Sequence, residues 1–211
     1  MVITRNKIEV KNLQTRKKVR VILVTDGDRV AQKVVEDIAR SLNLRCISAS
    51  AGNPTPISGE EIVSLLKEVP YDPVLVMFDD RGKREKYYGE YALEAVASHP
   101  DVEVLGAVAV ASNTTGIVGI EPDLCVDSLG HIVRDAAVDK KGDVRRAADG
   151  GKVIAGDTVD VLNDLDIPLI VGVGDIGKMD HADDLARGAP ITKKAIEEIL
   201  KRSGIDYGSP G

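Results

Sequence analysis

Short aliphatic runs alternate along the chain with longer segments in which apolar positions recur every three or four residues. The runs are rich in Val, Ile and Leu, which is typical of strands buried on both faces of a sheet. Five runs are predicted to be strands: residues 21–24, 44–47, 74–78, 102–111 and 169–171. The segments between them are long enough for helices.

These intervening segments carry recognisable helix signals. Val34 and Ile38 belong to an apolar stripe with i, i+4 spacing between residues 30 and 42. Ser58 and Glu61 form an S-x-x-E capping box, which predicts a helix from residue 58 to about residue 68. Further helices are predicted at residues 84–98, with Tyr88 and Tyr91 on the apolar side, at 157–165, with Asp157 as the cap, and from Pro190 to a C-terminal cap at Gly204.

Alternating strands and helices predict a parallel sheet, because a parallel connection is long enough to hold a helix. We therefore expect one α/β domain over residues 20–211, with a mostly parallel, doubly wound, Rossmann-like sheet and helices on both faces. The segments 124–126 and 131–133 flank a turn and predict a small β-hairpin, and residues 139–151 are predicted to be a surface loop. The residues predicted to be fully buried are Val34, Ile38, Val76 and Ile170.

Charge is distributed unevenly along the chain. Residues 1–20 hold seven basic residues and one acidic residue, whereas the remainder holds 21 basic and 33 acidic residues. An acidic body with only 3% aromatic residues argues against a broad nucleic-acid surface, so no nucleic-acid partner is expected. Residues 1–19 are predicted to be a disordered basic extension, either a solvated or vector-derived terminus or a segment that touches an anionic membrane.

No segment predicts membrane insertion. The longest apolar run, residues 104–111, is far shorter than the roughly 20 residues that span a bilayer. No N-terminal stretch has the apolar centre of a signal peptide. We therefore expect a soluble protein whose membrane role, if it has one, is peripheral.

Aspartates follow three of the predicted strands. Asp26 and Asp28 follow the first, Asp79 and Asp80 the third, and Asp175 the last. Parallel strands end at one edge of the sheet, where ligands of open α/β folds bind. The sequence therefore predicts an acidic edge, with Asn53 of the loop 50–54 beside it and Asp26, Asp28 and Asp79 as candidate Mg²⁺ ligands. The competing interpretation is that these aspartates only cap helices.

Other reactive residue types do not form a catalytic pattern. Cys46 and Cys125 belong to no CxxC pair and are predicted to be buried thiols. The three histidines, His99, His131 and His181, stand outside any nucleophile motif, and no G-x-G-x-x-G or Walker A pattern occurs. We therefore expect no catalytic residue and no cofactor, with Mg²⁺ as the one candidate ion.

Several segments, in order, resemble the soluble form of stage V sporulation protein AE. They are residues 21–28 (VILVTDGD), 46–55 (CISASAGNPT), 71–80 (YDPVLVMFDD), 99–112, 156–184 and 188–204. The resemblance implies a non-enzymatic subunit of the calcium-dipicolinate transport assembly of sporulation and germination. It also implies a peripheral place at the inner membrane of the forespore or spore, with other soluble and membrane subunits of the same operon as partners. A homo-oligomer is left open.

A second, more distant resemblance concerns residues 24–29 (VTDGDR) and the helix that follows, which are similar to the Asp-x-Asp segment of Toprim domains. That resemblance implies a Toprim-like form of the predicted α/β sheet, as the alternative to a Rossmann-like one, and Mg²⁺-dependent phosphotransfer or nuclease chemistry. Toprim domains also use a glutamate after an earlier strand, whereas the glutamate that precedes residue 21 here, Glu9, lies in the basic segment. A third hypothesis is a sensor that binds dipicolinate or its calcium complex at the acidic edge.

Overall fold

The computed structural model describes residues 17–80, 87–112, 118–145, 151–156 and 158–207. Within these residues, seven strands form one sheet: β1 (Val19–Val24), β2 (Arg45–Cys46), β3 (Val74–Met77), β4 (Val102–Val110), β5 (Leu124–Val126), β6 (Ile132–Val133) and β7 (Ile170–Val173). The α-helices are α1 (Arg29–Ser41), α2 (Gly59–Glu68), α3 (Tyr88–Ala97) and α4 (Pro190–Arg202). Short 3₁₀ helices are η1 (Ser48–Ser50), η3 (Asp160–Asp164), η4 (Asp180–Asp183) and η5 (Leu185–Arg187).

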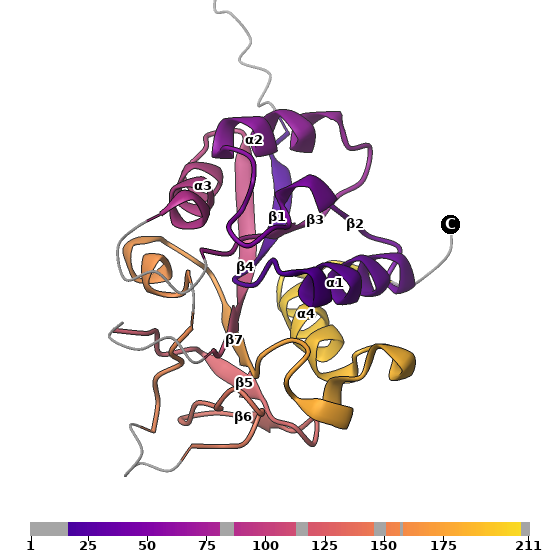
Figure 1. Cartoon of the computed structure of the whole chain (residues 1–211). Coiled ribbons are helices and arrows are strands. Elements are labelled where there is room, and N and C mark those ends of the chain that lie inside the picture. Colours follow the sequence, from indigo (N-terminus) through magenta and orange to yellow (C-terminus); the bar gives the residue numbers. More distant parts are fainter. Residues whose placement is uncertain (1–16, 81–86, 113–117, 146–150, 157, 208–211) are drawn as a thin grey trace, which may run out of the picture.

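The sheet has the strand order β2-β3-β1-β4-β7-β5-β6 (Figure 1). Every neighbouring pair is parallel except β5–β6, which is the antiparallel hairpin. The chain leaves β1 toward β2 on one side and leaves β4 toward β5 on the other. The adjacent strands β1 and β4 therefore form a topological switch point, and the predicted doubly wound α/β fold is confirmed.

Helices cover both faces of this sheet, as predicted. Helices α1 and α4 pack on one face, and α2, α3 and η3 pack on the other (Figure 1). Val34 and Ile38 of α1 are 2% and 1% exposed, and Val76 and Ile170 of the sheet are also buried. All four residues predicted for the core are thus confirmed there.

The helix starts follow local capping rules. Asp28 caps α1, because its carboxylate accepts hydrogen bonds from the N–H groups of Val30 and Ala31 at 2.7 and 2.9 Å. The capping box of Ser58 and Glu61 at α2 is confirmed.

Two helix predictions need correction. Tyr88 and Tyr91 were placed on the apolar side of their helix, but they are 63% and 57% exposed. The buried face of α3 runs instead through Gly89, Ala92, Leu93 and Val96. Gly89 lies so close to the backbone of Asp79 that no side chain fits there, and this contact turns both tyrosines outward.

The helix predicted at residues 157–165 is the shorter 3₁₀ helix η3, and Asp157 lies outside the described residues. Residues 84–86 of the predicted third helix lie outside them as well. Residues 1–16 of the predicted extension 1–19 also lie outside the described residues. The predicted boundary needs correction, because Val19 already belongs to β1 and donates its N–H to the Asp101 carbonyl at 2.9 Å. Within the described segments, no helix combines the length and apolar character needed to cross a membrane.

Candidate functional site

A small pocket of about 90 Å³ opens at the carboxyl ends of the parallel strands. Five of the six residues predicted for the acidic edge line it: Asp26, Asp28, Asn53, Asp79 and Asp175. The others in its lining are Thr25, Val110, Ser112 and Lys178. Since β1 and β4 both end here, the pocket lies at the switch point, the usual ligand position in open α/β sheets.

Backbone and hydroxyl contacts fix the base of this pocket. Thr25 is 2% exposed, and its hydroxyl accepts a hydrogen bond from the Val110 N–H at 3.0 Å, which joins the end of β1 to that of β4. The Gly52 N–H donates to the Gly27 carbonyl at 2.7 Å, and the Thr55 N–H donates to the Asp79 carbonyl at 2.9 Å. These last two contacts bring the loop that carries Asn53 against the ends of β1 and β3.

The Asp26 carboxylate is under electrostatic stress. Its pKa is raised well above the ordinary value, first by burial and then by the negative charges of Asp28, Asp79 and Asp175. One hydrogen bond from the Asp28 N–H, at 3.3 Å, partly opposes this shift. Asp26 therefore holds a proton more readily than an exposed aspartate. A positive charge nearby would stabilise its ionised form.

The capping interpretation holds for two of the aspartates. Asp28 caps α1, as described above. Asp80 is 1% exposed and does not line the pocket; its carboxylate accepts hydrogen bonds from the N–H groups of Gly89 and Glu90, at 2.5 and 2.8 Å. Because Asp80 lies ten residues before Glu90, this cap at the start of α3 comes from the end of β3 and not from the adjacent residue Tyr87.

Lys178 supplies positive charge to the pocket, and sequence reasoning missed it. Its amine contacts the Asp175 carboxylate at 2.6 Å, and that contact raises the pKa of Lys178. The pKa of Asp175 is raised by burial, although the hydrogen bond and charge of Lys178 oppose the shift. The signal available in the sequence was a lysine three residues after the strand-end aspartate.

The three predicted Mg²⁺ ligands lie at this pocket. Asp26, Asp28 and Asp79 line one pocket, yet the described residues contain no group of three or more His, Cys, Asp or Glu side chains arranged to hold a metal ion. The Mg²⁺ site therefore stays a prediction. Any cation that entered would compete with the Lys178 amine for Asp175.

A protein-family model matches most of this chain. The sequence model of SpoVAE, stage V sporulation protein AE1, matches residues 20–203. The chain belongs to this family. No match was found among curated proteins or among solved structures. The resemblance drawn from the sequence segments is thus confirmed, and the chain is a sporulation protein of the SpoVAE family.

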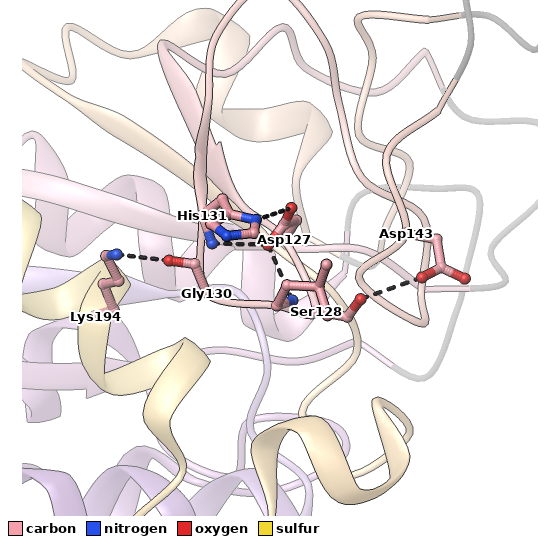
Figure 2. A network of polar contacts seen from close by, with 7 residues as sticks. Asp127, Ser128, Gly130, His131, Asp143 and Lys194 are labelled. Carbon is pink, nitrogen blue, oxygen red and sulfur yellow. Dashed lines mark hydrogen bonds and ion pairs between the residues drawn. The ribbon is translucent and has the colours of Figure 1, made fainter.

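A second polar network in this SpoVAE chain holds the β5–β6 hairpin (Figure 2). The Asp127 carboxylate accepts hydrogen bonds from the N–H groups of Leu129 and His131, at 2.9 and 2.7 Å, and its other oxygen lies 3.3 Å from the His131 ring. Lys194 of α4 donates to the Gly130 carbonyl at 2.5 Å. His131 therefore takes part in shaping the turn, as a structural residue would.

The two cysteines of this family member are free thiols. Cys125 is buried, and burial raises its pKa to about 11, so the thiol stays protonated near neutral pH. Cys46 was also predicted to be buried but is only half-buried, because it lies in β2, a strand at the edge of the sheet. Burial raises the pKa of Cys46 as well.

The stress on Asp26 gives a testable pH dependence. A carboxyl whose pKa is raised by folding stabilises the fold most below its unfolded pKa, near 3.8, and this contribution is lost as the pH rises through the folded pKa. In Asp26→Asn the side chain cannot ionise, so the stability does not fall at this position as the pH rises. The amide oxygen can still accept the hydrogen bond from the Asp28 N–H. We expect a melting temperature above that of wild type at pH 7, with about 2–4 °C gained per kcal/mol, and no gain at pH 4.

Thermal melts of both proteins between pH 4 and pH 8 measure this difference. Asp166→Asn, at an exposed position outside the pocket, is the matched control and should change nothing. A variant of Asp26 that is equally or less stable than wild type at pH 7 would contradict the electrostatic account.

Proposed function

We propose that this chain is a non-enzymatic, membrane-peripheral subunit of the assembly that transports calcium dipicolinate in sporulation and germination. The observation that carries the proposal is membership of the SpoVAE family across residues 20–203. In this proposal other soluble and membrane subunits of the same operon hold the chain at the inner membrane of the forespore or spore.

The pocket chemistry limits how dipicolinate could be recognised by this chain. Dipicolinate is a dianion near neutral pH, so the four carboxylates of the pocket repel it. Calcium prefers oxygen ligands and could bridge the carboxylates of the pocket and those of dipicolinate. A sensor function at this pocket therefore requires the calcium complex, or calcium first, and not free dipicolinate.

Spore chemistry tests the transport role. An endospore-forming host that lacks the chain should make spores with strongly reduced dipicolinate, and the wild-type chain should restore it. Ile132→Ala, at an exposed edge position, is a control that should restore it equally. Normal dipicolinate in spores that lack the chain would contradict the proposal.

Membrane attachment through partners is tested by vesicle flotation. The isolated protein should not bind neutral vesicles, because attachment is proposed to require the partner subunits. Binding to anionic vesicles that is lost when residues 1–16 are deleted, which leaves β1 complete, would assign membrane contact to the basic segment. Tight, salt-resistant binding to neutral vesicles would contradict attachment through partners.

A Mg²⁺-dependent, Toprim-like activity is the second candidate. The observation that favours it is the shared pocket of Asp26, Asp28 and Asp79. For the transport subunit we expect millimolar Mg²⁺ to leave the melting temperature unchanged. A saturable Mg²⁺ shift that is lost in Asp79→Asn would favour the Toprim-like candidate, and a shift seen only with calcium and dipicolinate together would favour the sensor.

A further inference from the structure

An open groove of about 430 Å³ lies at the β2 edge of the sheet, between this strand and the end of helix α2. β2 stands at one end of the strand order, so its outer side has no neighbouring strand among the described residues (Figure 1). Arg45 and Cys46 line the groove from β2, and Leu65 and Glu68 line it from α2. The groove shares no residue with the acidic pocket.

The backbone of β2 directs one donor and one acceptor outward from the sheet. The Ile47 N–H donates to the Leu75 carbonyl at 2.9 Å, and Arg45 is paired with Val74. Since the peptide groups of successive strand residues point to alternate sides, Arg45 and Ile47 bond to β3, whereas the N–H and carbonyl of Cys46 point away from it. A second strand can satisfy such outward groups at an edge.

The groove also carries one positive and one negative side chain that do not pair with each other. Arg45 donates to the Leu44 carbonyl at 2.8 Å, and its guanidinium lies 3.8 Å from the centre of the Tyr71 ring. Glu68 is exposed. In the part of the chain that the structure describes, neither Arg45 nor Glu68 belongs to an ion pair. Both charges are therefore available to an occupant of the groove.

We propose that a second copy of this chain occupies the groove, and that the β2 strands of the two copies pair antiparallel about a twofold axis. In a twofold interface the same patch faces itself, so opposite charges within one patch complement each other. Arg45 of each copy then faces Glu68 of the other. The outward N–H and carbonyl of Cys46 bond to the same groups of the other Cys46.

A second copy suits the groove better than an occupant with one sign of charge. An anion would match Arg45 but leave Glu68 without a partner, and a cation would do the reverse. The twofold pairing satisfies both charges and both outward backbone groups at once. It leaves the acidic pocket untouched, and it does not depend on the transport proposal.

Cross-linking of the full chain tests where the two copies meet. In an antiparallel pair centred on Cys46, the two Cα atoms lie about 5.5 Å apart, within the range that a disulfide spans. Mild oxidation should therefore give a covalent dimer. Cys46→Ser should abolish this product and leave the dimer fraction in analytical ultracentrifugation unchanged. Cys125 is buried and does not supply the link in the folded protein.

Charge reversal tests how the two copies recognise each other. Arg45→Glu and Glu68→Arg, each alone, place like charges opposite each other and should raise the dimer dissociation constant about tenfold or more. The double variant exchanges the two charges and should restore most of the affinity. Glu60→Arg, at an exposed position of α2 outside the groove, is the matched control and should change nothing. Circular dichroism checks that each variant is folded.

A chain that stays monomeric at every concentration tested would overturn the proposal. A dimer would also overturn it if oxidation gave no link through Cys46, because the copies would then meet at another face. The same holds if the single reversals left the dissociation constant unchanged, or if the folded double variant failed to recover affinity.

Discussion

Replacing Ile38 with Ala is expected to lower the free energy of unfolding by about 2–5 kcal/mol. Ile38 is 1% exposed and belongs to the core between α1 and the sheet, in the same cluster as Val34, Leu75 and Val108. The substitution removes buried methyl and methylene groups and leaves a cavity, because close-packed neighbours relax only in part.

Urea unfolding followed by circular dichroism measures this loss. The matched control is Ile132→Ala in β6, where the isoleucine is 37% exposed and the cost should be well below that at Ile38. A loss below about 1 kcal/mol at Ile38 would mean that α1 packs against the sheet through another face.

Asp80→Ala is expected to cost about 1–3 kcal/mol, because it leaves the N–H groups of Gly89 and Glu90 without their carboxylate partner. Asp80 is almost fully buried, so water cannot simply replace it. Asn offers one acceptor oxygen, and Asp80→Asn should therefore retain part of the stability.

The same unfolding experiment tests Asp80, with Asp37→Ala on the exposed side of α1 as control. Asp37 makes a surface ion pair with Arg40, whose contribution is expected to be at most about 1 kcal/mol. The Asp80 variants should also leave the pocket intact, since Asp80 does not line it. If Asp80→Ala were as stable as wild type, capping from the end of β3 would not anchor α3.

The contrast between Asp79 and Asp80 matters for the site. These neighbours leave the same strand, but only Asp79 lines the pocket, whereas Asp80 holds the start of the next helix. A pair of aspartates after a strand thus divides between a candidate ligand position and a structural cap. Mutating both together would mix the two effects, so each needs its own variant.

Sequence patterns alone determined much of this protein. Local signals are strong in this chain: aliphatic runs, i, i+4 stripes, the Ser58 capping box and the first-turn Pro190. They predicted the parallel α/β fold, the hairpin and the core position of Ile38. The gathering of strand-end aspartates at one edge also followed, because parallel strands must end on the same side of a sheet.

Tertiary structure decided the features that depend on distant contacts. The outward rotation of Tyr88 and Tyr91 follows from the close approach of Gly89 to Asp79, which no local pattern encodes. The different roles of Asp79 and Asp80 depend on where α3 begins relative to β3. The pairing of Lys178 with Asp175 places a cation among four carboxylates, and that arrangement arises only when the ends of β1, β3 and β7 are assembled side by side.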